Sequence, residues 1–331
     1  TTLVPRFGLQ MPQVSRTFAL PSSCLPERLA YTITVAYLLC RIADTIEDDA
    51  GRSPADKRRL LEHFSAALED DGPGAGPLAE AFRESRDAEQ GLTASADRVL
   101  DEFARLPATE RALIRPWVQE MCHGMADTAD LLAAREASGV GALETIEELR
   151  QYCYYVAGTV GHLLTDVFQA GLGLAPGRVA ELHRLGHGFG LGLQLTNIIK
   201  DVRDDRGRGV SFVPAALCRR HGIAPEAFGG TAPPEATRAV VDELVAEARC
   251  WLHDGLDCVT RLPATAYGIR RFCLSALLLA RRTLSRIERT PEFPHAMSSL
   301  KITRPEVRRT VLVGSVIAPL NPLVRAYYRS L

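Results

Sequence analysis

Apolar residues recur at spacings of three and four along most of this chain, and this pattern constrains the fold more than any other feature of the sequence. Such spacing places apolar side chains on one face of an α-helix. Alternating Val, Ile and Thr residues between hairpin turns, which would predict strands, are nearly absent. We therefore expect an all-α protein, with helices over residues 29–46, 54–68, 94–103, 108–132, 144–168, 178–204, 237–261 and 265–287.

Glycine- and proline-rich breaks separate these predicted helices without dividing the chain. They fall at residues 71–77, 174–177, 206–214 and 229–235, and each is short enough to be an ordinary loop. A chain of 331 residues can bury a large core within one domain. The prediction is a single domain over residues 1–331.

The charge balance and the cysteines limit the classes of partner and compartment. Lys and Arg number 39 against 40 Asp and Glu, so no overall positive field draws the chain onto nucleic acid. The eight cysteines are scattered without a Cys-x-x-Cys pair, which is typical of reduced thiols in a cytoplasmic protein. Residues 1–10 lack the apolar run of a secretion signal, and the longest apolar stretch, residues 311–320, is too short to span a membrane. We expect a cytoplasmic protein.

An acidic stripe ends the first predicted helix. Asp44, Glu47 and Asp48 are three or four residues apart, which places their carboxylates on one helix face. Like charges at these spacings repel, and the surrounding residues of the helix are apolar. The stripe therefore needs a counter-charge, which a divalent cation would supply.

A second stripe has the same construction. Asn197, Asp201 and Asp205 recur every four residues, with Gln194 just before them. Oxygen ligands of this kind suit Mg²⁺, which commonly bridges carboxylates to substrate phosphates. The two stripes therefore predict a magnesium site for a phosphorylated substrate.

Each stripe also carries a base, Arg41 in the first and Lys200 in the second, suited to the outer oxygens of a diphosphate. The competing interpretation is that each stripe is a solvated face or is paired with its own bases. Two matched stripes in apolar helices favour a clamp. If they face each other across a helical bundle, they hold one or two diphosphates between them.

A diphosphate clamp implies carbocation chemistry. Mg²⁺ and basic side chains stabilise the charge on a departing diphosphate, which leaves an allylic cation behind. Such a cation survives only where water is excluded, so the cavity wall should be apolar with aromatic faces. The aromatic candidates for this wall are Tyr37, Tyr152, Tyr155, Phe189 and Phe272. For each of them, packing in the core is the alternative role.

Four alternate glycines, at positions 186, 188, 190 and 192, fall inside a predicted helix. Each costs about 1 kcal/mol there relative to Ala. A prenyl chain against the backbone, a local kink or tight helix packing would compensate. His183 and His187 in the same helix are four residues apart, but no third ligand accompanies them, so we set a zinc site aside.

In six ordered segments the chain resembles the squalene/phytoene synthase family, from about residue 15 to residue 309. The segments are residues 15–18 (SRTF), 41–48 (RIADTIED), 152–161 (YCYYVAGTVG), 194–205 (QLTNIIKDVRDD), 212–214 (FVP) and 301–302 (KI). The resemblance implies a single all-α isoprenoid synthase domain, a helical bundle in which the two stripes face each other across a central cavity.

The resemblance also implies a reaction. In that family two prenyl diphosphates, farnesyl diphosphate in squalene synthases, join head to head through a cyclopropylcarbinyl diphosphate. Squalene synthases then reduce the last cation with NADPH, whereas dehydrosqualene and phytoene synthases lose a proton. By resemblance, Tyr152 lies beside the departing diphosphate, Gln194 lines the cavity near the reacting carbons, and Phe272 forms a wall for the second half-reaction.

Several details resemble the squalene branch and imply NADPH as a cofactor. The positions that this branch uses for cofactor phosphates are Arg16, Arg41, Lys200 and Lys301, with Arg304 as a further base. Two departures matter: relatives often have a second base where Thr303 stands, and Ala276 replaces a frequent proline. The alternative is that Lys301 and Arg304 are surface bases.

Other interpretations within the enzyme class remain open. The chain could stop at presqualene diphosphate, release dehydrosqualene or phytoene, or prenylate a non-prenyl acceptor. From a different class, it could be a catalytically inactive helical binding protein, against which the intact carboxylates of both stripes argue. Membrane contact would be peripheral at most, through residues 311–331.

Overall fold

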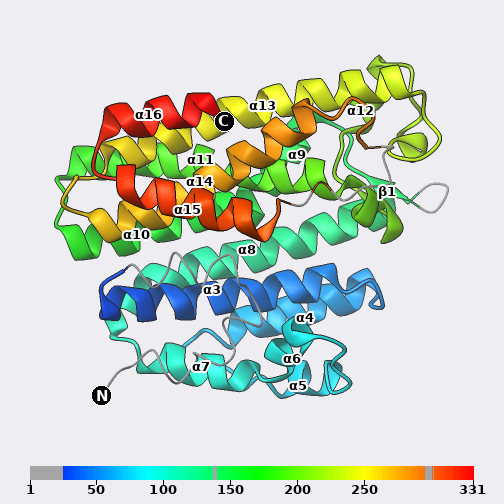
Figure 1. Ribbon diagram of the computed structural model, residues 1–331. Helices are drawn as coiled ribbons and strands as arrows, with labels where there is room; N and C mark the ends of the chain where they lie inside the picture. Colours follow the sequence, from blue (N-terminus) through cyan, green and yellow to red (C-terminus); the bar gives the residue numbers. More distant parts are fainter. Residues whose placement is uncertain (1–24, 137–139, 295–299, 301) are drawn as a thin grey trace. The chain divides into compact units, whose positions relative to one another are not determined.

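The structure is a computed structural model that describes residues 25–136, 140–294, 300 and 302–331 (Figure 1). Helices contain most of these residues. Within the described ranges the strands are β1 (Gly141–Ala142) and β2 (Val210–Ser211), which pair in parallel. The prediction of an all-α protein is confirmed.

The chain divides into two compact units. The first contains the chain up to Asp130 and the later segment His162–Ala180, and the second contains Leu131–Gly161 and Glu181–Leu331. Each unit has buried helices of its own. The single domain over residues 1–331 stays a prediction.

In the first unit, α3 is the central helix, with α4, α6 and α7 packed against it (Figure 1). Its buried side chains, among them Val35, Leu39, Ile42 and Ile46, recur at helical spacing and cover nearly the whole circumference. α3 is long and apolar enough to span a bilayer, but 67% of its apolar window is buried in the structure. The helices of this unit are α3 (Glu27–Asp48), α4 (Pro54–Ala66), α5 (Gly76–Ala81), α6 (Ala88–Ala94), α7 (Ala96–Arg105) and the greater part of α8 (Ala108–Ala134).

The second unit contains most of the remaining helices. Here α13 packs on α14 and α14 on α15, while α16 contacts both α13 and α15 (Figure 1). The greater part of α10 and the first residues of α11 belong to the first unit. The elements are α9 (Ile146–Cys153), the π-helical turn η2 (Tyr154–Gly158), α10 (Thr159–Leu172), α11 (Pro176–Gly207), α12 (Ala215–Arg220), the 3₁₀ turn η3 (Pro225–Ala227), α13 (Pro234–Arg261), α14 (Tyr267–Glu288), α15 (Arg304–Ile317) and α16 (Asn321–Ser330).

A buried arginine connects the ends of these helices. Arg270 in α14 is only 1% exposed, and its guanidinium donates to the carbonyl oxygens of Leu262 at 2.8 Å and Ala318 at 2.7 Å. A third donor contacts the side chain of Asn321 at the start of α16. Burial lowers the pKa of Arg270. Backbone and amide oxygens thus satisfy this arginine where α13, α14 and α16 meet.

The alternate glycines of α11 allow close helix packing. A Cβ on Gly190 would lie 2.2 Å from the carbonyl oxygen of Ala157, and a Cβ on Gly161 would lie 2.1 Å from that of Gly186. Contacts this short leave no room for a side chain, and α11 continues without interruption from Pro176 to Gly207. Helix packing therefore compensates for these glycines, and the alternative of a kink is not needed.

Among the described residues, five α-helices were not predicted from the sequence: α5, α6, α12, α15 and α16. The first three have six or seven residues, too few for an apolar period to show. The start of α15 was detectable, because Thr303 and Glu306 form a capping box around Pro305. The predicted helix 144–168 is not uniform, since η2 separates α9 from α10.

Candidate active site

The first acidic stripe occupies the last turns of α3. Asp44 is half-buried, with 28% of its side chain exposed, whereas Asp48 is exposed. Arg41 Nη1 lies 3.6 Å from Asp44 Oδ2, and Arg41 Nη2 donates to Glu89 in α6. Arg41 Nε is buried and has no hydrogen-bond partner. Arg41 therefore joins two carboxylates and retains one donor for a further acceptor.

The surroundings of Asp44 oppose its ionisation. Burial is the main cause that raises its pKa to about 7, and the carboxylates of Asp48 and Glu89 act in the same direction against Arg41. The buried thiols of Cys40 and Cys122 lie near enough that Asp44 helps to raise their pKa as well. Added positive charge would favour the carboxylate form of Asp44. The raised pKa of Asp44 and the Nε donor of Arg41, which has no hydrogen-bond partner, suit a site for a metal ion and a phosphate at the end of α3.

The second stripe follows one face of α11 and contacts its own bases. Lys200 Nζ lies 3.0 Å from Asp201 Oδ2 and 3.4 Å from Asn197 Oδ1. Asp205 is buried, and its Oδ1 lies 2.6 Å from Arg208 Nη2. Pairing with its own bases, the competing interpretation from the sequence, therefore describes the contacts of Asp201 and Asp205. A metal ion at Asp205 would share this carboxylate with Arg208 or displace it.

The two stripes belong to different units, so their facing arrangement and the central cavity stay predictions. In the part of the chain that the structure describes, no three His, Cys, Asp or Glu side chains gather closely enough to hold a metal ion. Mg²⁺ usually keeps several waters and is held by one or two carboxylates together with substrate phosphates. The donor set of each stripe, carboxylate and amide oxygens, is of that kind.

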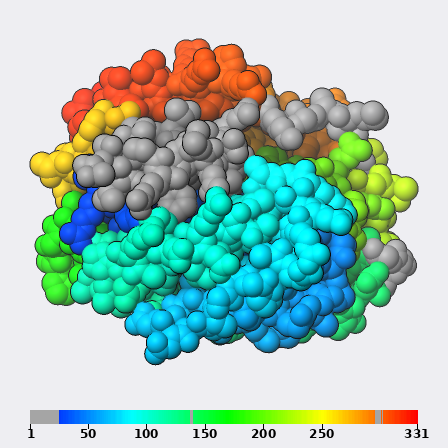
Figure 2. All heavy atoms as spheres, turned by 90° about the horizontal axis from the view of Figure 1, so that it is seen from below, coloured from blue at the N-terminus to red at the C-terminus, as the bar shows by residue number. Residues whose placement is uncertain are grey.

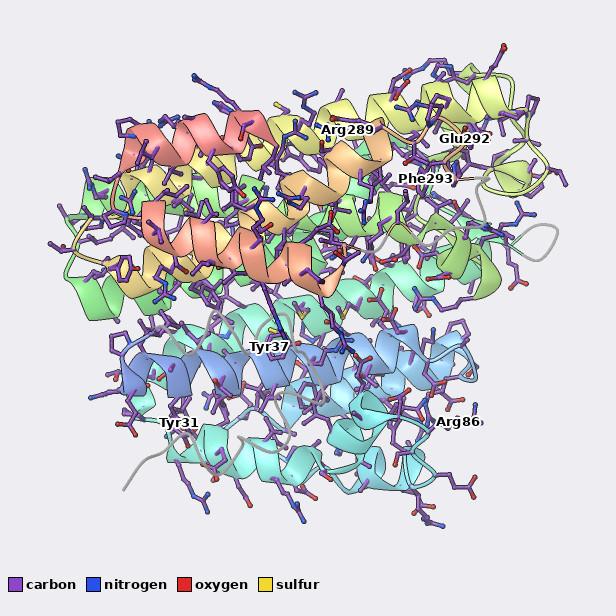
Figure 3. All side chains as sticks on the ribbon, in the orientation of Figure 1. Tyr31, Tyr37, Arg86, Arg289, Glu292 and Phe293 are labelled. Atoms are coloured by element: carbon purple, nitrogen blue, oxygen red, sulfur yellow. The ribbon has the colours of Figure 1, made fainter. Side chains whose placement is uncertain are left out.

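The predicted aromatic wall is mostly buried. Tyr152 in α9 stacks on Phe212, with ring centroids 4.2 Å apart and planes 8° apart. Phe189 and Phe272 are buried among other side chains, as core packing requires. Tyr37 in α3, labelled in Figure 3, and Tyr155 in η2 are half-buried. The π-helical turn η2 begins two residues after Tyr152, and such turns recur at functional sites.

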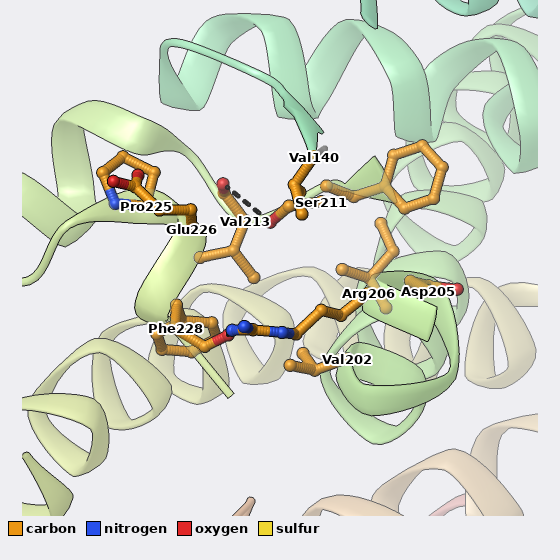
Figure 4. Close-up of a pocket in the computed structure, with 11 residues that line it drawn as sticks. Val140, Val202, Asp205, Arg206, Ser211, Val213, Pro225, Glu226 and Phe228 are labelled. Atoms are coloured by element: carbon orange, nitrogen blue, oxygen red, sulfur yellow. Dashed lines mark hydrogen bonds between the residues drawn. The ribbon is translucent and has the colours of Figure 1, made fainter. Parts of the chain in front are cut away.

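A small pocket borders the second stripe at Asp205 (Figure 4). Its volume is about 10 Å³, enough for about one water molecule. Arg206 crosses it and donates to the carbonyl oxygen of Phe228 at 3.0 Å, while Val202 and Phe212 form apolar parts of its wall. This pocket is too small for a prenyl chain.

The predicted cofactor contacts fall in several parts of the chain. Arg16 and Lys301 lie outside the described residues, as does the segment 15–18. Arg304 is exposed and begins α15. Thr303, which stands where relatives often have a base, accepts a hydrogen bond from the backbone of Glu306 and so caps that helix. Gln194 is half-buried in α11.

Two charged neighbours of the stripes were missed from the sequence. Glu89 lies 48 residues from Arg41 in the chain, so no local spacing could connect them. Arg208, in contrast, follows Asp205 by three residues, and that spacing on a helix end is a detectable ion-pair signal.

The chain is an all-α protein in which each of two helices carries an acidic stripe and an accompanying base. These features define a class of helical proteins built to hold a metal ion and a phosphorylated substrate. A sequence model described as squalene/phytoene synthase matches residues 11–309. The chain therefore belongs to the squalene/phytoene synthase family.

Named relatives agree with this assignment. The chain is 28% identical over 323 residues to a squalene synthase of Schizosaccharomyces pombe, an alignment that covers 96% of this chain and 66% of the relative. It is 34% identical over 207 residues to squalene synthase ERG9 of Gibberella zeae, covering 62% of this chain and 42% of the relative. The chain thus spans between about four tenths and two thirds of the length of these relatives.

Solved structures share the fold. A ligand complex of TcSQS aligns with a TM-score of 0.80 and 24% identity, over 99% of this chain and 90% of that chain. A dehydrosqualene synthase in complex with a ligand aligns with a TM-score of 0.60 and 20% identity, over 98% of this chain and 99% of that chain. At these identities the structural likeness concerns the fold alone.

Proposed function

We propose that this chain is a prenyltransferase of the squalene synthase type, which joins two prenyl diphosphates head to head. The observation that carries the proposal is the pair of acidic stripes, each beside a base, in a chain of the squalene/phytoene synthase family. Burial raises the pKa of Asp44 to about 7, and strongly shifted carboxyls of this kind are common at functional sites. The squalene synthases among the relatives support the reaction type.

The proposed first step is ionisation of one prenyl diphosphate. Mg²⁺, when bound by Asp44, Glu47 and Asp48 on α3 and by Asn197, Asp201 and Asp205 on α11, would neutralise the departing diphosphate. Arg41 and Lys200 donate to the outer diphosphate oxygens, and the buried Nε of Arg41 is a donor placed for such an acceptor.

The remaining residues act on the carbon skeleton. Tyr152, fixed by its stacking on Phe212, lies beside the leaving group, and Gln194 lines the cavity near the reacting carbons. The π electrons of the double bond of the second prenyl diphosphate add to the allylic cation, and loss of a proton to the released diphosphate closes the cyclopropane of presqualene diphosphate. Phe272 excludes water from the cation of the second half-reaction.

The proposed second step is reductive. Ionisation of presqualene diphosphate would release the second diphosphate, and NADPH, when bound, would supply the hydride that reduces the rearranged cation to squalene. Arg16, Lys301 and Arg304 would contact the cofactor phosphates, together with Arg41 and Lys200. Farnesyl diphosphate is the proposed substrate, because the two relatives described above are squalene synthases, the branch of the family that uses this substrate.

We also propose a cytoplasmic protein that touches membranes only at its periphery. Both substrate and product are oily, and exposed apolar side chains gather on α15 and at the start of α16. Figure 2 shows the orange-red atoms of this region at the molecular surface. The proposed partners of the chain are prenyl diphosphates and the surface of a bilayer.

Product analysis tests the proposed function. The purified chain is incubated with farnesyl diphosphate and Mg²⁺, with and without NADPH, and hydrocarbons and diphosphate esters are identified by mass spectrometry. Squalene formed only with NADPH is the expected result. Presqualene diphosphate or dehydrosqualene in both mixtures would remove the reductive step, and absence of any Mg²⁺-dependent diphosphate release would overturn the enzyme assignment.

A further inference from the structure

The acidic side chain of Glu89 lies beside the first stripe but has no role in the function proposed above. Glu89 belongs to α6, which packs against α3 (Figure 1). Its carboxylate accepts a hydrogen bond from Arg41 Nη2, although the two residues are 48 positions apart in the chain. The side chain of Glu89 is 40% exposed and that of Arg41 is 26% exposed, so solvent and small ligands can reach this ion pair.

The start of α6 fixes the place of Glu89. Asp87 caps this helix, and its Oδ1 accepts from the backbone N–H groups of Glu89 at 2.9 Å and Gln90 at 2.8 Å. The hydroxyl of Thr93 donates to the carbonyl oxygen of Glu89 at 3.1 Å. A carboxylate in the first turn also interacts favourably with the helix dipole. The backbone that carries the Glu89 side chain is therefore held by contacts within α6 itself.

Two carboxylates compete for the guanidinium of Arg41. Nη2 donates to Glu89, whereas Nη1 lies 3.6 Å from Asp44 Oδ2, which is longer than a normal hydrogen bond. Arg41 and Asp44 are three residues apart on α3, a spacing at which a close ion pair can form. Glu89 therefore draws the guanidinium away from Asp44. Without Glu89, Arg41 could close on Asp44 and occupy an oxygen that is assigned to Mg²⁺.

A purely structural explanation is that this ion pair fastens α6 to α3. Partly exposed ion pairs contribute little to stability, and α6 already contributes the buried side chains of Leu92 and Thr93 to the core. Arg41 Nε, moreover, is buried and has no hydrogen-bond partner among the described residues. Fastening two helices does not require such a donor, because a buried unpaired donor is destabilising. A role in binding explains the arrangement better.

We propose that Glu89 is a positioning residue for the diphosphate: it orients the guanidinium of Arg41 and keeps it from pairing closely with Asp44. Asp44 then stays available to a metal ion. A guanidinium has five donors in a planar fork, so Glu89 can hold one edge of Arg41 while other donors bind a diphosphate oxygen. This inference rests on the roles proposed for Arg41 and Asp44 and adds Glu89 to them.

Binding of inorganic pyrophosphate tests this role without any turnover. The full chain is titrated by calorimetry with pyrophosphate in the presence of Mg²⁺. We expect E89A to raise the Kd by roughly tenfold, because one charge-assisted hydrogen bond has this strength. E89Q keeps an acceptor for Arg41 without the charge, so it should lose less affinity than E89A. It also tests the proposal if E89A is poorly folded.

The direction of the change separates positioning from a simple charge effect. Removing a negative charge near an anion site would by itself strengthen the binding of pyrophosphate, whereas loss of positioning weakens it. E84A removes the same charge from an exposed residue with no assigned role and should leave the Kd unchanged. Unchanged or tighter binding of pyrophosphate in both E89A and E89Q would overturn the proposal.

A double-variant cycle shows whether Glu89 acts through Arg41. In R41Q the guanidinium that Glu89 orients is absent, so adding E89A should change the Kd for pyrophosphate by less than about twofold. An equal loss from E89A in the parent and in R41Q would show that Glu89 acts independently of Arg41, and the positioning role would be wrong.

The same variants separate this inference from the proposed function. If the parent chain releases diphosphate from farnesyl diphosphate but E89A binds pyrophosphate as the parent does, the positioning role is wrong and the enzyme assignment stands. If the cycle gives the expected coupling in a chain that does not turn over farnesyl diphosphate, the positioning role stands and the prenyltransferase assignment is wrong. A parent chain that does not bind pyrophosphate with Mg²⁺ would overturn the inference.

Discussion

Asp48 and Asp44 belong to one stripe but differ in surroundings, since Asp48 is exposed and Asp44 is half-buried beside Arg41. Replacing Asp48 by Ala should therefore leave the fold intact while it removes a magnesium ligand. We expect Mg²⁺-dependent release of diphosphate from farnesyl diphosphate to fall by roughly 10²–10³-fold or more, as when a main stabiliser of developing charge is removed. A coupled diphosphate assay measures the rate.

Asp101→Ala is the matched control, because Asp101 is also exposed on a helix of the first unit and has no assigned role. Its rate should equal that of the parent chain. Full activity of Asp48→Ala would contradict the magnesium assignment of the first stripe.

A second residue-scale prediction concerns pH. The hydrogen bond from Arg135 is the main favourable contact of Glu148, and it lowers the pKa of this carboxyl below its usual 4.5. Glu148 in the folded state therefore binds its proton less readily than in the unfolded state, and its contribution to stability is present above pH 4.5 and lost as pH falls through the folded pKa. Glu148→Gln should lower the free energy of unfolding by about 1–2 kcal/mol at neutral pH.

Urea denaturation at several pH values measures this difference. The difference in free energy of unfolding between the Glu148→Gln variant and the parent chain should become smaller as the pH falls below 4.5. Glu147→Gln, at a side chain that is 73% exposed, should show almost no gap at any pH. A gap for Glu148→Gln that is independent of pH would show that packing, and not charge, causes it.

Among residues, the sequence predicted local relations well and distant ones poorly. The i, i+3 and i, i+4 positions of Asp44, Asp48, Asp201 and Asp205 follow directly from helical periodicity. The contact between Arg41 and Glu89 does not, because it depends on how α6 packs against α3. The raised pKa of Asp44 has the same origin, since burial depends on neighbouring helices.

At the scale of elements, the glycines of α10 and α11 offer a direct test of close packing. Gly161 and Gly171 both lie in α10, but an added Cβ on Gly161 would meet the carbonyl oxygen of Gly186 at 2.1 Å, whereas nothing lies within 4 Å of one on Gly171. Gly161→Ala should lower the free energy of unfolding by about 1–3 kcal/mol or more, because the backbones must separate.

Gly171→Ala should be neutral or should stabilise the chain by up to about 1 kcal/mol, since Ala restricts the unfolded chain and favours helix. Thermal or urea denaturation of both variants gives the comparison. Equal stability of the two variants would show that the backbones do not approach closely in solution, and a bound prenyl chain would again be needed to explain the glycines.

Long periodic helices such as α3, α8, α11, α13 and α14 were predictable because each presents many turns of apolar spacing to a core. Short helices were not, since α5 and α12 have six residues each and owe their shape to tertiary packing. The sequence also left the glycine stretch ambiguous. Only the contact of Gly190 with Ala157 shows that a neighbouring backbone occupies the space of the missing side chain.

At the scale of the whole molecule, the uneven distribution of exposed apolar side chains matters most. Four of the five large apolar residues that are exposed in the described part lie between α15 and the start of α16: Leu312 (66%), Val316 (69%), Leu320 (52%) and Leu323 (48%). Leu312 and Val316 are one turn apart on α15, and the exposed Arg308 precedes them by a turn. An apolar helix face beside basic residues is suited to the surface of an anionic bilayer.

We therefore expect the chain to float with vesicles that contain anionic phospholipid and to bind less to purely zwitterionic vesicles. The double variant L312S/V316S should lose at least about tenfold in vesicle affinity, because each side chain removed from the interface forfeits apolar burial. Ala326→Ser, an exposed position of α16, is the control and should float like the parent. Since α15 packs on α14 through other residues, such as the buried Thr310 and Gly314, the double variant should keep its thermal stability. Equal flotation of L312S/V316S and the parent would exclude α15 as the membrane contact, and absence of flotation for the parent would exclude peripheral binding by this surface altogether.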